Sequence, residues 1–300
     1  MMISRCSTAA AYAPRHDAPH TDPGPGCGGD RNREIDALVR RALAPNRVRL
    51  ACPGMEHLAH RLLDELAERG QGDLMAEYAE PFVIRTIARV LGLPDDDADR
   101  IRRFTEDASV LLGPQEDRDG EGPGAPDQLL RFGRVAGFLD HLTERIAEKR
   151  RAPDGGIVSV LVHADGARPS DPEIRRAVVE LLLSGRSAAR IVGGAIHRST
   201  AGPASADAVA AGRSPVPELR DGTGDRSGVG VGRHLVDALV PLLVPIVVDA
   251  LLDRLAHLRA GGPRRPAAAP QSRAPRALTA HWTLPDEHRP RTTGLPALVS

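Results

Sequence analysis

Four short stretches of the sequence carry side chains whose types and spacing could do chemistry. In the first, His57, His60 and Asp64 fall on one face of an expected helix, at positions i, i+3 and i+7. Imidazole and carboxylate groups are ligands of Zn²⁺, so a metal site is one interpretation. A polar helix face in contact with water explains the same spacing without a metal. We therefore predict that these residues hold no metal.

The second and third stretches fall short of known binding motifs. The run GVGVGRH at 228–234 lacks the G-x-G-x-x-G spacing of a dinucleotide-binding loop, and no strand precedes it. Asp95, Asp96 and Asp97 stand at an expected helix start, where the helix dipole favours negative charge. We interpret these acids as capping residues rather than as a metal cluster. No Ser/His/Asp or Cys/His set for nucleophilic catalysis stands out elsewhere.

The fourth stretch, LLLSGRSAARIVGG at 181–194, is expected in the middle of a long buried helix. Ser184, Gly185 and Ser187 add nothing to the stability of such a helix, and an interior Gly costs about 1 kcal/mol relative to Ala. The small residues therefore need an explanation from ancestry or from the chemistry of a site.

The charge balance argues against a polyanionic partner. The chain has 40 Lys and Arg against 40 Asp and Glu, so no overall field attracts nucleic acid or an anionic membrane. Lys149 is the single lysine among the 40 cations, and Ala, Gly and Pro are abundant. This usage is typical of a GC-rich coding sequence, such as those of actinobacteria.

The cysteines and the apolar segments favour a soluble cytoplasmic protein. Cys6, Cys27 and Cys52 show neither paired nor zinc-binding spacing, and the first 20 residues have no apolar core of signal-peptide length. The apolar run at 235–252 is interrupted by two acids and two prolines, short of the roughly 20 residues of a membrane span.

Apolar residues recur at helical spacing along most of the chain, which predicts a mainly α fold with little β. Gly92 and Pro94 should end the third helix, and Ser170 with Glu173 forms a capping box. The expected helices lie around 35–42, 58–66, 82–91, 98–112, 129–146, 170–196 and about 235–258. Residues 113–127 and 201–228 have the composition of loops.

In this order the elements resemble those of the bacterial cytochrome P450 family. Residues 36–48 resemble the family's helix C, and residues 60–107 resemble its helices D and E and the start of helix F. Residues 138–194 resemble helices G, H and I. Near the end, residues 228–238 resemble the haem-ligand loop and residues 248–259 resemble helix L. The resemblance covers about residues 30–200 and 226–300. It implies a truncated P450-like helical fold with four parts. These are a flexible segment 1–29, a helical region 30–200, a linker 201–227, and a region 228–300 with the ligand loop and helix L.

The resemblance also implies why small residues interrupt the buried helix. In the family's helix I, a small residue and a Gly precede an acid and an alcohol, which open the helix for dioxygen and relay protons to it. Ser184 and Gly185 keep the first pair, whereas Ser187 stands at the acid position and Ala188 at the alcohol position. This chain therefore lacks the acid–alcohol relay.

The ligand loop departs from the family at the iron-binding position. Its glycines match at Gly230 and Gly232 and its histidine at His234, but the ligand position is Val236 and the next glycine position is Ala238. P450 chemistry needs a Cys thiolate on the iron, and no cysteine follows residue 52. His234 as an iron ligand stays open as an alternative, while we interpret it as an inherited packing residue.

Two further haem signatures are altered. The helix C segment that holds a haem propionate aligns with 32–36, where Glu34 and Asp36 replace cations and so have the wrong sign for a propionate. Only about 30 residues separate helix I from the ligand loop, too few for the family's J and K helices and most of its sheet. The resemblance therefore implies a protein that has lost its haem site and binds no cofactor.

Family members without the ligand Cys act as auxiliary partners of glycosyltransferases that attach deoxysugars to polyketide aglycones. The resemblance implies a similar role in antibiotic biosynthesis: a pseudoenzyme that activates or stabilises its transferase in a hetero-oligomer. A P450-like relic or ligand-binding scaffold without a transferase is one alternative, and a haem monooxygenase is another that the missing thiolate disfavours. Some apolar side chains near the end of the buried helix could face either the protein core or a partner, and we predict that they lie in the core: Ile191, Val192, Ala195 and Ile196.

Overall fold

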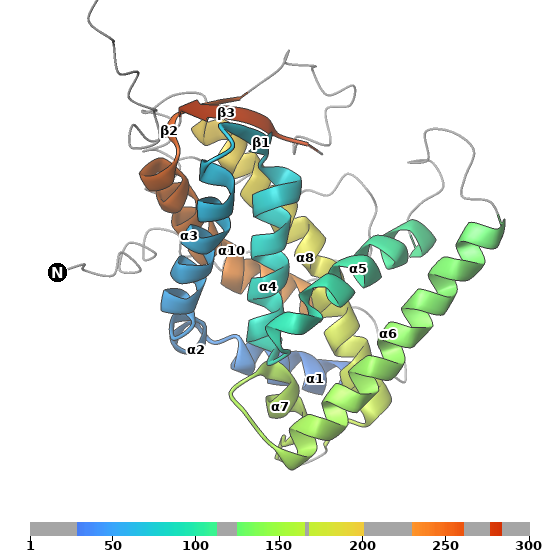
Figure 1. The fold of residues 1–300 in the computed structure, drawn as a ribbon. Coiled ribbons are helices and arrows are strands. Elements are labelled where there is room, and N and C mark those ends of the chain that lie inside the picture. The colour runs from blue at the N-terminus through green and yellow to red at the C-terminus, as the bar shows by residue number, and fades with distance from the viewer. Residues whose placement is uncertain (1–28, 113–124, 166–167, 201–229, 261–276, 284–300) are drawn as a thin grey trace, which may run out of the picture.

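The computed structural model describes residues 29–112, 125–165, 168–200, 230–260 and 277–283. This part of the chain is mainly helical, as predicted (Figure 1). Its helices are α1 (Gly29–Ala42), α2 (Pro45–Arg49), α3 (Cys52–Ala67), the π-helix η2 (Met75–Ala79), α4 (Glu80–Leu91), the 3₁₀ helix η3 (Asp95–Asp97), α5 (Ala98–Leu112), α6 (Ala125–Arg151), α7 (Ile157–Val162), α8 (Asp171–Ser199) and α10 (Val231–Arg254). The segments predicted as a flexible N-terminus (1–29) and a linker (201–227) lie outside the described residues, except that Gly29 begins α1.

The core lies between four helices, α3, α4, α8 and α10 (Figure 1). In α3, α4 and α8, Leu, Ile and Val residues recur every three or four positions and form an apolar face that is turned inward. Helix α10 packs along α8 and also against α3. The prediction that the apolar residues near the end of α8 belong to the core is confirmed by their burial: Ile191, Val192, Ala195 and Ile196.

Two predicted helix boundaries are confirmed in detail. Gly92 ends α4 with φ 82°, a left-handed conformation that Gly adopts without the Cβ penalty of other residues. At the start of α8, Ser170 and Glu173 form the capping box, and the backbone N–H of Ser170 donates to Glu173 Oε2 at 2.7 Å. Because both signals lie in the residues at the helix ends themselves, the end of α4 and the start of α8 could be predicted from the sequence.

The capping carboxylate predicts how stability depends on pH. Arg31 of α1 donates to Glu173 at 2.9 Å, and this bond, with those from Ser170, lowers the pKa of Glu173 from 4.5 to about 2. A carboxylate with a lowered folded-state pKa contributes stability above its unfolded-state pKa and loses it as the pH falls. In urea unfolding, wild type should have a higher free energy of unfolding than Glu173→Gln at pH 7. This difference in free energy should shrink as the pH falls from 4.5 to 2. A difference independent of pH would contradict this role.

A small antiparallel sheet covers one end of the helices, in strand order β1-β3-β2. The strands are β1 (Gln71–Asp73), β2 (Ala256–Ala260) and β3 (Thr279–Thr283). The prediction of a helix up to about residue 258 is wrong at this point, because α10 ends at Arg254 and the chain pairs with β3 instead. Paired strands from distant parts of the chain leave no local helical or turn signal that would predict them.

Helix α10 runs through both of its prolines, which we expected to interrupt the apolar run. Pro241, Pro245 and Asp249 lie on the partly exposed side of the helix, while its other sides are buried. Each proline removes one helical hydrogen bond, and burial of the surrounding Leu and Val side chains offsets that loss. This helix is long and apolar enough to cross a membrane, but 61% of its most apolar 18-residue window is buried inside the protein, as in a core helix.

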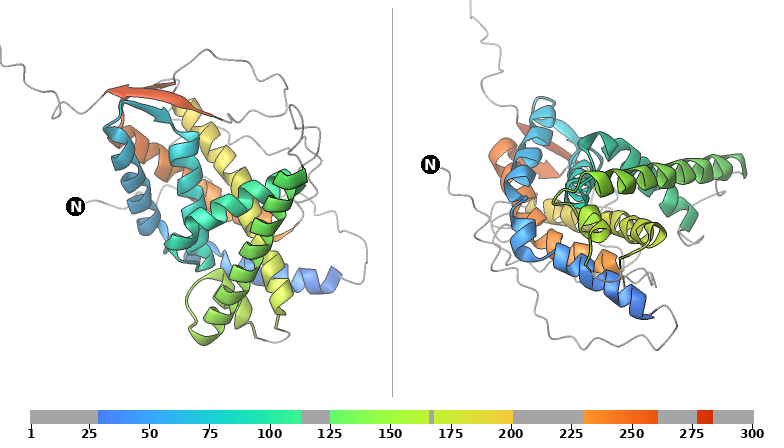
Figure 2. Two further views of the ribbon diagram at one scale, coloured as in Figure 1. Left: turned by 45° about the vertical axis from the view of Figure 1, so that its right-hand side comes forward. Right: turned by 90° about the horizontal axis from the view of Figure 1, so that it is seen from below.

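Helix α6 extends beyond the rest of the fold at its N-terminal end (Figure 2). Its C-terminal half packs on α5, α7 and α8 through Phe138, Leu142 and Ile146, as the apolar spacing predicts. Leu129, which the sequence places on the same apolar face, is instead 73% exposed. The helix also begins at Ala125, inside the segment predicted as a loop.

Candidate functional site

The small residues of α8 lie where α10 crosses it most closely. A Cβ atom on Gly232 would come within 2.9 Å of Ser184 Cβ and 3.2 Å of the carbonyl oxygen of Glu180. Two residues earlier, at the residue before α10, a Cβ on Gly230 would overlap the Glu180 carboxylate. The two helices therefore touch directly at the positions that the P450 resemblance assigns to helix I and to the ligand loop.

The neighbouring residues of α8 also serve close packing. Gly185 faces α4, where a Cβ on it would lie 2.7 Å from Ile87 Cδ1. Ser184 Oγ donates to the Leu181 carbonyl oxygen at 2.7 Å, so its hydroxyl is satisfied within the helix. Ala188 is fully buried and Ser187 is partly buried. In this fold the Ser184–Gly185 pair makes room for two helices, which gives the cost of an interior Gly a structural reason.

The predicted ligand-loop histidine and the altered propionate position contact each other. His234 Nε2 lies 2.8 Å from Asp36 Oδ1, which joins the start of α10 to α1. Asp36 also pairs with Arg40 one turn along α1. The imidazole nitrogen that would reach an iron is therefore already engaged with a carboxylate.

Acidic side chains of α1 and α8 lie near this contact, each accompanied by an arginine. Burial raises the pKa of Glu180, with Arg176 acting in the opposite sense and Asp36 raising it further. Glu34, the other acid of the altered helix C segment, pairs with Arg31 at 2.9 Å. Acids at these positions would repel the carboxylates of a haem rather than bind them.

The segment that resembles a ligand loop is helical in the structure. Helix α10 begins at Val231, so Gly232, His234, Val236 and Ala238 all lie in its first turns, which corrects the expected loop. Val236 and Ala238 are partly buried and pack against the core. With a helix in place of the loop, Ser184 against Gly232, and no thiolate, the described residues do not fit a haem held as the P450 resemblance implies.

The tight contact between α8 and α10 predicts a coupled mutational effect. Gly232→Ala should destabilise the fold by about 1 to 2 kcal/mol, because its new methyl group meets Ser184 Cβ. Gly194→Ala is the matched control, because Gly194 is also a buried glycine within a helix. A Cβ on Gly194 would meet only the end of the Arg198 side chain, at 3.5 Å. The double variant Gly232→Ala with Ser184→Gly should recover part of the loss in urea unfolding. Strict additivity of the two changes would contradict the contact.

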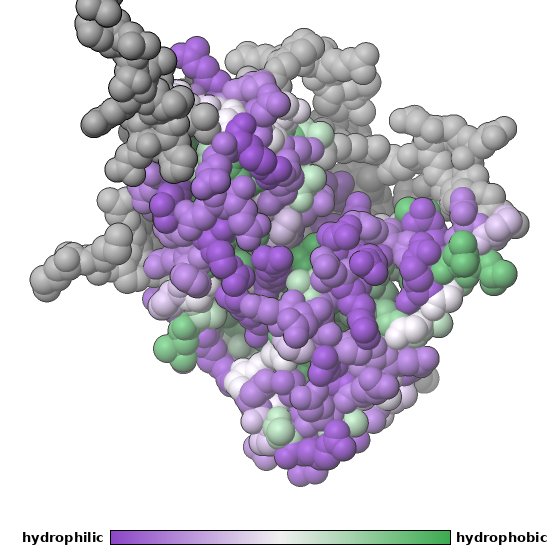
Figure 3. Space-filling view, in the orientation of Figure 1, coloured by the Kyte–Doolittle hydropathy of each residue, from purple (hydrophilic) through white to green (hydrophobic). Residues whose placement is uncertain are grey.

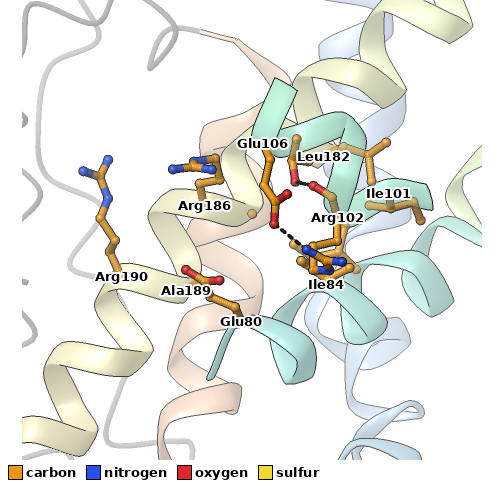
Figure 4. Close-up of a pocket in the computed structure, with 12 residues that line it drawn as sticks. Glu80, Ile84, Ile101, Arg102, Glu106, Leu182, Arg186, Ala189 and Arg190 are labelled. Atoms are coloured by element: carbon orange, nitrogen blue, oxygen red, sulfur yellow. Dashed lines mark hydrogen bonds and ion pairs between the residues drawn. The ribbon is translucent and has the colours of Figure 1, made fainter. Parts of the chain in front are cut away.

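A separate small pocket lies between α4, α5 and α8 (Figure 4). Its apolar wall includes Ile84 and Ile87, and burial raises the pKa of Glu80 at its edge. Arg102 and Glu106, one turn apart on α5, pair at its rim at 2.7 Å. The enclosed volume is about 50 Å³, well below the roughly 300 to 1,000 Å³ of a typical ligand site.

The residues that the sequence considered as metal ligands all lie on α3, in different surroundings. Asp64 pairs with Arg254 at 3.1 Å, His57 is exposed, and His60 Nδ1 is buried without a hydrogen-bond partner. Within the described ranges, no three His, Cys, Asp or Glu side chains come together as a metal site.

The three consecutive acids do lie at a helix start, in η3, but two of them bind arginines of other elements. Asp95 accepts hydrogen bonds from Arg89, and the buried Asp97 contacts Arg145 and His141 of α6. The sequence missed this buried cluster. Its only local signal was the spacing of His141 and Arg145 on one side of α6.

Comparison with known proteins agrees with this fold. No protein-family model matches the chain. Over 150 residues the chain is 34% identical to cytochrome P450 107B1 of Saccharopolyspora erythraea. This alignment covers 49% of the chain and 34% of that relative. The crystal structure of HmtT, involved in himastatin biosynthesis, superposes with a TM-score of 0.65 at 22% identity, covering 92% of this chain and 90% of that one. A second structure, described as one of unusual cytochrome P450-like monooxygenases involved in microbial secondary metabolism, superposes with a TM-score of 0.65 at 21% identity. The superposition covers 94% of this chain and 85% of that one.

The helical architecture is therefore that of a P450-like fold. Over about half of its length the chain is related by sequence to the cytochrome P450 family. It spans about a third of the length of the relative named above.

Proposed function

We propose that this chain is a haem-less P450-like protein that acts by binding another protein. The observation that carries the proposal is the closed contact of α8 with α10 at Ser184 and Gly232, together with the engagement of His234 by Asp36. In the described residues, Val236 stands at the ligand position, a helix stands where the resemblance implies the ligand loop, and Glu34 and Asp36 stand where it implies cations for a propionate. The contribution of this chain to chemistry then comes through a partner.

The partner we propose is a glycosyltransferase that attaches a deoxysugar to a polyketide aglycone during antibiotic biosynthesis in the cytoplasm. Support comes from the P450-like fold without the ligand Cys and from similar structures tied by their titles to himastatin biosynthesis and to secondary metabolism. Such a helper acts by binding the transferase's active conformation more tightly than its inactive one. Couplings of this kind are worth about 1 to 3 kcal/mol, or about 5- to 150-fold.

The test begins with the gene neighbourhood: a glycosyltransferase gene adjacent to this one supplies the partner to be tested, whereas an isolated gene would favour a relic without a transferase. The full chain and the transferase are co-expressed, one of them is tagged, and both co-purification and sugar transfer to the aglycone are measured. We expect a stable complex and a transfer rate raised within the 5- to 150-fold range of a typical coupling. The transferase with an equal concentration of serum albumin is the control for non-specific stabilisation. Absence of a complex, or equal activity with albumin, would overturn the partner role and favour a scaffold without a transferase.

A further inference from the structure

We draw no further inference here: the strongest candidate, the apolar surface of Leu129, Leu130 and Phe132 at the N-terminal half of α6 (Figure 3), carries none because nothing in the structure shows what covers it.

Discussion

Gly156→Ala is expected to lower the free energy of unfolding by about 3 kcal/mol, at the upper end of typical overpacking costs. The new Cβ would lie 2.5 Å from Gly92 Cα, 2.6 Å from Gly92 N and 2.7 Å from the carbonyl oxygen of Leu91. All three are backbone atoms, which cannot turn aside as a flexible side chain can. Gly156 has φ −72° and ψ 160°, a conformation open to Ala, so the predicted loss is entirely steric.

Urea unfolding at neutral pH measures this loss directly. Gly155→Ala is the matched control, because a Cβ on the preceding residue meets nothing within 4 Å. The control should unfold within about 0.5 kcal/mol of wild type, as surface substitutions usually do. Equal stability of the two variants would show that the turn after α6 can move away from the end of α4.

Asp97→Asn is expected to cost about 2 to 3 kcal/mol through the loss of charged hydrogen bonds at a buried carboxylate. Asp97 is 4% exposed and lies 2.9 Å from both Arg145 Nε and His141 Nε2. Arg100 can only donate to His141 Nδ1, so Nε2 carries the proton and donates to Asp97. Burial alone would raise the pKa of Asp97, but the hydrogen bonds from Arg145 and His141 outweigh it and the pKa is lowered.

The same carboxylate gives a pH signature. Since its folded-state pKa is lowered, its stabilising contribution is present above the unfolded value of 3.8 and is lost as the pH falls through the folded value. The stability difference between wild type and Asp97→Asn should therefore be constant near neutral pH and decline below about pH 4. Asp96→Asn, an exposed neighbour, should behave like wild type. A large effect of Asp96→Asn would place the important charge at the helix start rather than in the buried cluster.

The helices could be predicted from the sequence because their signals are local. Apolar spacing located α3, α4, α5 and α8, and the terminal residues Gly92 and Ser170 located two boundaries. The strands could not be predicted, because β1 and β3 come from distant parts of the chain and are short. The start of α10 was missed for a related reason. A Gly-rich segment favours a loop by composition, and its helix is stabilised by packing on α8.

The contacts of the candidate site could not be predicted from the sequence. Ser184, Gly185 and His234 could be singled out by resemblance alone, whereas their contacts with Gly232, Ile87 and Asp36 depend on how three helices meet. In the described residues, the positions that the resemblance assigns to helix I and to the ligand loop pack directly against each other.

The most direct test of this account is the absorption spectrum of the purified full chain, expressed with a haem precursor and then reduced under carbon monoxide. The closed contact of α8 with α10 and the engaged His234 predict no Soret band. His234→Ala provides the control for weak surface-bound haem, which should be equal in both proteins. A stoichiometric Soret band in wild type, at whatever wavelength, would show that the chain binds haem and would contradict the account.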